Sequence, residues 1–212
     1  HVDAGEWEIE WRAGVQDEDE GFERAFVLDV GYGITPWWFT ELVVEYEGVS
    51  GAGGGIEAWE WENIFQLTEA GQYAVDLGWF AKYEAVRASG APDELVTGPM
   101  LQKDFGSTQA NLNLLFGREV GAGHSDDATL GYAWQAKWRG NPRFELGLQG
   151  FGDFGALDRL GSQHEHRVGP AAFGLLPLGT GRKLKYDLAL LVGVGDDAPD
   201  RTARLSVEYE FR

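Results

Sequence analysis

Two three-residue segments combine side chains that catalyse reactions or bind metals in proteins. Residues 124–126 have the sequence His-Ser-Asp, the residue types of a serine hydrolase. Three adjacent loop residues rarely reach the geometry of nucleophile, base and orienting group, which distant segments usually supply. Residues 164–166, His-Glu-His, offer two imidazoles and a carboxylate, but the sequence indicates no further ligand, so a surface loop is the simpler interpretation. We therefore predict no catalytic residue, no metal site and no enzyme activity.

Glycine-rich and acidic segments are the remaining candidates for a binding site. Gly51–Gly55 and Gly179–Lys183 are only superficially like phosphate loops, because neither has the GxxxxGK[ST] spacing or precedes a helical pattern. Both are predicted to be turns. The acidic run Asp17–Glu20 is expected to be solvated, although its carboxylates would also suit Mg²⁺ or Ca²⁺. No cofactor is predicted, and the absence of cysteine excludes disulfides and thiolate metal sites.

The composition limits the fold and the partners of the chain. Its 212 residues are expected to form one domain, residues 1–212. The 31 glycines and the 13% aromatic content favour strands and tight turns over a helical bundle. No run reaches the roughly 18 consecutive apolar residues of a membrane-spanning helix, and the net charge of -18 argues against nucleic acid as a partner. Because no apolar leader is present at His1, we expect a mature protein from which a signal peptide has been removed.

Alternation of apolar and polar residues runs along the whole chain and must position the functional side chains. Residues 7–11, Trp-Glu-Ile-Glu-Trp, are typical of a strand with one apolar and one charged face. The pattern predicts an all-β fold of about twelve antiparallel strands. Its phase is least regular at 95–105 and 166–176, where Pro99 and Pro170 cannot donate to the ladder.

The direction of the apolar face separates two kinds of barrel. A soluble barrel buries this face and a membrane barrel turns it to lipid, so alternation alone does not decide. Long loops are expected to alternate with tight turns near residues 35, 70, 106, 141 and 180, as in outer-membrane barrels. The tryptophan and tyrosine rings on the apolar face are too numerous to pack inside a small soluble barrel. A membrane barrel, in contrast, places such rings in aromatic girdles at the two membrane interfaces. The aromatic residues predicted to face the membrane are Trp7, Trp11, Tyr32, Trp38, Tyr46, Trp59, Trp61, Trp79, Tyr83, Tyr132, Trp134, Trp138, Tyr186, Tyr209 and Phe211.

The chain resembles bacterial outer-membrane β-barrels, as a class, over nearly its whole length. Its last predicted strand, Leu205–Phe211, is similar to the C-terminal aromatic signal of those proteins and is followed here by Arg212. The resemblance implies an up-and-down transmembrane β-barrel of the small porin-like class in the bacterial outer membrane, surrounded by lipid and lipopolysaccharide. A soluble ligand-binding β-barrel is the alternative, and it would purify without detergent.

With the apolar face outside, the charged face encloses a lumen. The lumen is therefore expected to contain water or a dense network of ion pairs, because an unpaired buried charge is strongly unfavourable. Acids on the early strands opposite Lys137 and Arg139 would favour the passage of cations or small polar solutes. A sealed barrel that acts through its outer loops or a protein partner, and a lipid hydrolase, remain alternatives. The predicted lumen-lining residues are Glu41, Glu45, Glu47, Glu60, Glu62, Asp76, Lys82, Lys137, Arg139, Glu145, Asp187, Glu208 and Glu210.

Overall fold

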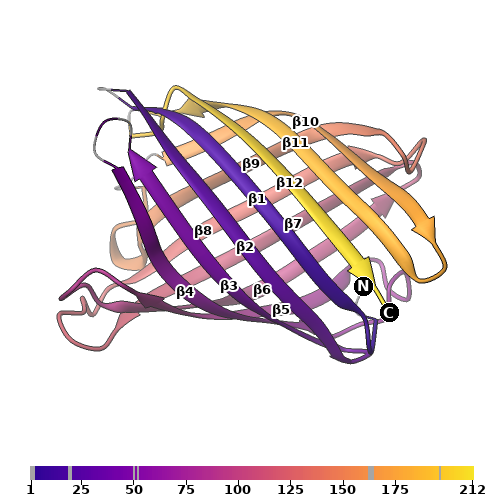
Figure 1. The fold of residues 1–212 in the computed structure, drawn as a ribbon, viewed down its shortest axis with the longest axis horizontal. Coiled ribbons are helices and arrows are strands. Elements are labelled where there is room, and N and C mark those ends of the chain that lie inside the picture. Colours follow the sequence, from indigo (N-terminus) through magenta and orange to yellow (C-terminus); the bar gives the residue numbers. More distant parts are fainter. Residues whose placement is uncertain (1–2, 19–20, 50, 52, 162–164, 196) are drawn as a thin grey trace.

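The computed structural model describes residues 3–18, 21–49, 51, 53–161, 165–195 and 197–212. Its antiparallel strands form one closed barrel, in which β1 pairs with both β2 and β12 (Figure 1). The predicted all-β, up-and-down barrel of about twelve strands is therefore confirmed. The strands are β1 (Trp7–Glu18), β2 (Gly21–Thr35), β3 (Trp38–Val49), β4 (Gly53–Gln66), β5 (Asp76–Val86), β6 (Asp93–Phe105), β7 (Thr108–Val120), β8 (Ala128–Trp138), β9 (Glu145–Ala156), β10 (Glu165–Gly179), β11 (Arg182–Val194) and β12 (Arg201–Phe211).

Pairing of the first and last strands closes the sheet. The register between β1 and β12 runs from Trp7 opposite Phe211 to Gln16 opposite Thr202. Closure removes the sheet edges, so every strand has a backbone partner on both sides. One short 3₁₀ helix, η1 (Leu157–Arg159), follows β9. No helix among the described residues has the length and apolar character needed to cross a bilayer.

The two chain termini lie at one end of the barrel, which we call the terminus end (Figure 1). The connections at 36–37, 106–107 and 180–181 are tight turns at this end. Gly181 has a φ of 66°, a left-handed conformation that glycine adopts without a steric penalty. The connection near residue 70 spans residues 67–75 and is not the tight turn that the sequence predicts. The connection 139–144 also lies at this end, where the backbone N–H of Arg139 donates to Ser107 O at 2.7 Å. The opposite end, the loop end, carries the other connections.

Two segments predicted as loops contribute to strands at the loop end. β1 continues to Glu18 and so includes part of the acidic run, and β4 begins at Gly53, inside the glycine-rich segment. Residues 19–20 lie outside the described residues. Backbone pairing explains the difference for β4, because the register continues to Val49 opposite Gly53 regardless of the missing side chains.

The two segments of irregular phase, β6 and β10, are full strands. Pro99 is opposite Trp79 of β5, while the register between β6 and β7 skips from Thr97 to Met100. Because proline has no backbone N–H, it cannot donate a hydrogen bond to one of the two neighbouring strands. The hydrogen-bond ladder is therefore weaker on that side only. This local gap obscures the alternation without ending the strand.

Alternate residues separate the outside of the barrel from its inside. On the outer face large apolar side chains are exposed, among them Leu42 at 67% and Trp61 at 52%. On the inner face acidic side chains are buried, among them Asp29 at 2% and Glu60 at 5%. A soluble barrel has the opposite arrangement. The outer surface therefore matches a protein whose surroundings are hydrocarbon.

A small apolar cluster also lies on the inner face. Ala171, Phe173, Ala189 and Leu191 are buried on β10 and β11 and pack with Phe151 of β9. These residues are the partners of inward-facing positions on the neighbouring strands. The lumen is thus partly filled along this wall, a feature that the sequence analysis did not predict.

Candidate functional site

Acidic residues on successive strands lie side by side across the inner face. Cross-strand pairing joins Glu60 to Glu84 and Glu84 to Glu94. Val43 occupies the one apolar position in this series. Because the strands are tilted, the series climbs from the terminus end of β1 to the loop end of β7 (Figure 1). We call it the acidic row, and its members are Glu10, Asp29, Glu60, Glu84, Glu94 and Glu119.

One lysine neutralises the centre of the acidic row. Lys82 Nζ lies 2.7 Å from Glu60 Oε1 and 2.6 Å from Glu84 Oε2. Carboxylate oxygens of Glu45, Glu60 and Glu84 lie within 4.8 Å of one another. Within the described residues no other lysine or arginine forms an ion pair with these three groups. Two of the three neighbouring carboxylates therefore form ion pairs with one ammonium group, and the third, Glu45, lies beside them.

The cations of the opposite wall are paired with acids of their own. Arg139 Nε lies 2.9 Å from Glu145 Oε1, and Lys137 Nζ lies 3.8 Å from the other oxygen of the same carboxylate. Lys185 Nζ lies 2.6 Å from Glu208 Oε1 and also contacts Glu210. Because these cations neutralise neighbouring carboxylates, they do not oppose the acidic row as free charges.

Amide side chains form a second series on β6 to β9. The Nδ2 of Asn111 donates to Gln102 Oε1 at 2.9 Å, and Gln135 Nε2 donates to Asn111 Oδ1 at 3.3 Å. Gln149 Nε2 extends the series to Gln135 Oε1 at 3.5 Å. This amide row offers neutral donors and acceptors on one wall, whereas most of the acidic row lies on β1 to β5.

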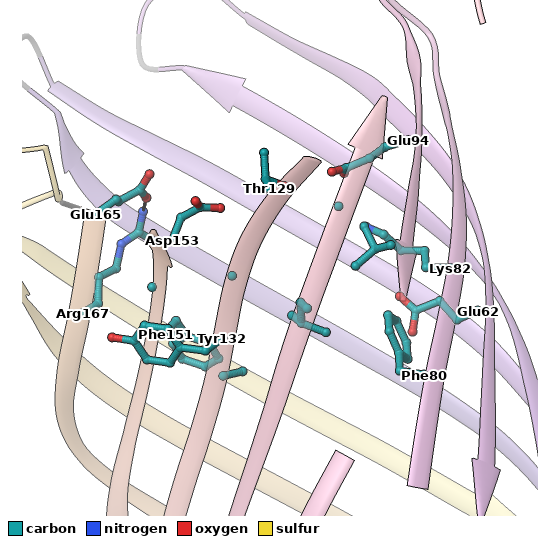
Figure 2. Close-up of a pocket in the computed structure, with 16 residues that line it drawn as sticks. Glu62, Phe80, Lys82, Glu94, Thr129, Tyr132, Phe151, Asp153, Glu165 and Arg167 are labelled. Carbon is teal, nitrogen blue, oxygen red and sulfur yellow. Dashed lines mark hydrogen bonds and ion pairs between the residues drawn. The ribbon is translucent and has the colours of Figure 1, made fainter. Parts of the chain in front are cut away.

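The lumen contains cavities towards both of its ends. The loop-side chamber, of about 490 Å³, is lined by residues of β4 to β10 that include Glu94, Thr129 and Arg167 (Figure 2). The terminus-side chamber, of about 620 Å³, includes Glu6 and Lys183. Each has the volume of a small-molecule site.

A belt of polar side chains separates the two chambers. On β9, Gln149 lies between Glu145, which lines the terminus-side chamber, and Phe151, which lines the loop-side chamber. Gln149 is only 3% exposed. On β1 and β2, Arg12 Nη2 lies 2.5 Å from the buried Asp29 Oδ2, and neither residue lines a chamber. We call Arg12, Asp29 and Gln149 the belt, in which Asp29 and Gln149 are buried and the side chain of Arg12 is 33% exposed.

Some predicted lumen residues lie apart from these clusters. Glu41 is opposite Glu62, next to the acidic row. Asp76 lies at the terminus end, where its Oδ1 accepts the backbone N–H of Gly71 at 2.8 Å. Glu47 is exposed near the loop end of β3. Asp187 lines the terminus-side chamber.

Several inner charged residues escaped the prediction. Glu94, Asp153, Glu165 and Arg167 line the loop-side chamber. Glu94 belongs to β6 and Glu165 and Arg167 to β10, the two strands of irregular phase, whereas Asp153 lies near the end of β9. Glu94 does alternate in phase with Val96, so a signal existed in that strand.

The aromatic residues predicted to face the membrane lie on the outer face and gather near both ends. At the terminus end the rings of Trp7 and Tyr32 lie 4.8 Å apart. At the loop end Tyr132 contacts Phe154 at 5.1 Å and His166 at 5.7 Å. The exposed members are Trp7, Trp11, Tyr46, Trp59, Trp61, Trp79, Tyr83 and Trp138, and the half-buried ones are Tyr32, Trp38, Tyr132, Trp134, Tyr186, Tyr209 and Phe211.

The His-Ser-Asp segment 124–126 does not form a triad. His124 Nδ1 is 2.7 Å from the carbonyl oxygen of Gly121, and its Nε2 is 3.6 Å from Asp126 Oδ1. The Oγ of Ser125 instead accepts the backbone N–H of Asp127 at 3.1 Å. Among the described residues no hydrogen bond joins Ser125 to His124, so the serine lacks a base in this arrangement.

The His-Glu-His segment differs from the surface loop that the sequence suggested. Glu165 and His166 begin β10, and His164 lies outside the described residues. The Nδ1 of His166 is 3.2 Å from the hydroxyl of Tyr132 on the outer face, while Glu165 pairs with Arg167 on the inner face. The strand therefore turns these two candidate ligands to opposite sides.

A closed barrel that is apolar outside and charged inside defines the class of transmembrane β-barrels. The fold is similar to an outer membrane channel from Pseudomonas putida F1, with a TM-score of 0.67, 13% identity and coverage of 100% of this chain and 96% of that chain. It is also similar to the NanC porin, with a TM-score of 0.63, 10% identity and coverage of 96% of this chain and 99% of that chain. The similarity to the KdgM porin has a TM-score of 0.58, 8% identity and coverage of 97% and 98%. No family model and no curated protein sequence matches the chain.

These similarities confirm the predicted fold, an up-and-down β-barrel that this chain shares with a bacterial outer membrane channel and with porins. At such low identities they concern the fold. The similar structures are channels and porins by name rather than enzymes.

Proposed function

We propose that the protein is a passive outer-membrane channel that passes small polar or cationic solutes through an acidic lumen. The observation that carries this proposal is the acidic row, in which Glu60 and Glu84 share the single ammonium of Lys82 beside the carboxylate of Glu45. Rings of carboxylates raise the local concentration of cations in pores. The chambers at both ends of the lumen supply space for a solute.

Conductance in planar bilayers under a KCl gradient tests the proposal. The reversal potential is expected to indicate a preference for K⁺ over Cl⁻, and Glu45→Gln and Glu60→Gln are each expected to reduce it. Glu69→Gln is the matched control, because Glu69 lies exposed in the connection 67–75. Absence of conductance at any voltage, or a preference for Cl⁻, would refute the channel or its selectivity.

A sealed barrel that acts through its outer loops is the second candidate, because two residues of the belt are buried. Asp29 and Gln149 are only 2% and 3% exposed. A sealed barrel would insert into bilayers and show heat-modifiable gel migration without any current. The conductance experiment therefore separates the two candidates directly.

A further inference from the structure

The loop-side chamber combines carboxylates near its mouth with aromatic rings deeper in the barrel. Glu94 lies near the loop end, and Phe80 lies below it in the direction of the terminus end (Figure 2). On the other side of the chamber Asp153 follows Phe151 by two residues towards the loop end of β9. On each side of the chamber, a phenylalanine therefore lies deeper in the barrel than the carboxylate.

The cations that line this chamber are already bound to other acids. Lys82 bonds to two members of the acidic row. Arg167 pairs with Glu165 and donates to a glutamine of β1 at 2.9 Å. In the described part of the chain no lysine or arginine forms an ion pair with Glu94 or Asp153. The chamber therefore presents two carboxylates with no cationic partner.

Small residues on β7 and β8 create the space between these groups. Gly117, Gly131 and Ala133 line the chamber. A Cβ added to Gly117 would lie 2.6 Å from Glu94 Oε1, so the glycine allows the carboxylate to lie across β7. Bulkier side chains at these positions would fill the cavity.

We propose that the loop-side chamber binds small organic ammonium ions that carry apolar substituents. The ammonium group is attracted by the carboxylates of Glu94 and Asp153 on the two sides of the chamber, and the apolar substituents contact Phe80, whose ring face attracts cations. The Phe151 ring adds apolar surface, since the guanidinium of Arg204 already lies 4.8 Å from its centroid. A bare metal ion fits less well, because among the described residues no group of three acidic or histidine ligands close enough to share an ion includes Glu94 or Asp153. The inference rests on the proposed channel function, in which this chamber lies on the path from the loop end.

Calorimetric titration of the detergent-solubilised barrel with choline tests the charge requirement. Neohexanol, in which carbon replaces the choline nitrogen, is the matched uncharged probe. Choline is expected to bind at least about tenfold more tightly than neohexanol, because only the cation gains charge-assisted and cation–π contacts. Equal affinities would overturn the proposal by making the chamber a merely apolar cavity.

Variants locate the site. The double variant Glu94→Gln and Asp153→Asn is expected to weaken choline binding about tenfold or more, the loss expected for a charge-assisted contact. Asp104→Asn is the control, because Asp104 lines the terminus-side chamber on the same strand as Glu94. It is expected to leave the affinity within about twofold. An equal loss in the control would place the site elsewhere.

A cavity-filling variant keeps the test decisive if the double variant does not fold. Ala133→Leu leaves every charge in place and is expected to abolish choline binding by occupying the chamber. Unchanged binding in Ala133→Leu would contradict the proposal. Calorimetry does not require conduction, so choline binding without current would refute only the channel function, and current without choline binding would refute only this site.

Discussion

Lys82 Nζ lies 2.7 Å from Glu60 Oε1, and this ion pair fixes the one lysine of β5 among three carboxylates. Their side chains are 17% and 3% exposed, so water screens the contact little. The lysine holds the like charges of Glu45, Glu60 and Glu84 together and also lowers the net negative charge that a solute meets. It therefore stabilises the lumen and limits its cation preference.

Lys82→Gln is expected to increase the preference for K⁺ over Cl⁻, because two carboxylates lose their shared cation. It is also expected to reduce the free energy of unfolding by about 1–3 kcal/mol, since the buried carboxylates exchange a charged donor for a neutral amide. Reversal potentials and urea unfolding in lipid vesicles measure the two effects. Lys103→Gln is the control, because Lys103 lies over the ring of Phe105 at 5.1 Å on the outer face. A shift of Lys82→Gln towards Cl⁻ would be incompatible with the acidic row as selectivity filter.

Gln149→Ala is expected to increase the single-channel conductance roughly twofold, because it opens the belt between the two chambers. Gln72→Ala makes the same change in the exposed connection 67–75 and is expected to leave the conductance unchanged. Single-channel recording in symmetric KCl measures both variants. Equal conductances would show that the constriction lies elsewhere in the lumen.

Trp38 and Asn63 form a polar contact on the outer face, where Trp38 Nε1 donates to Asn63 Oδ1 at 3.0 Å. Trp38→Phe is expected to reduce the free energy of unfolding by about 1–3 kcal/mol, because the amide, only 8% exposed, loses its donor. Adding Asn63→Leu removes the amide that lacks a hydrogen-bond partner, and the double variant is expected to regain most of the lost free energy of unfolding. Urea unfolding in lipid vesicles gives both values, and a double variant no more stable than Trp38→Phe would argue against this account.

Much of the fold could be predicted because a strand turns successive side chains to opposite faces. Trp59 and Glu60, for example, have opposite surroundings that follow from their positions in the alternation alone. Alternation did not predict the start of β4 at Gly53, because backbone pairing there does not depend on side chains. It was also irregular around Pro99, where the proline interrupts the hydrogen bonds to one neighbouring strand.

The clusters of the lumen could not be predicted, because alternation assigns a face but does not give the stagger between strands. A shift of two residues between β4 and β5 that placed Lys82 opposite Ile64 would keep it inside and move it away from Glu60. The pairing of Lys137 and Arg139 with Glu145 depends on such a register in the same way. Their roles as determinants of selectivity remain predictions.

Single-cysteine labelling tests the central claim most directly, since the chain has no cysteine of its own. Glu62 lines the loop-side chamber, and Leu42 is 67% exposed on the outer face. In planar bilayers a cationic, water-soluble thiol reagent is expected to change the current of Glu62→Cys and to leave that of Leu42→Cys unaltered. Modification of Leu42→Cys with protection of Glu62→Cys would contradict the claim that the carboxylates enclose water and the apolar side chains face lipid.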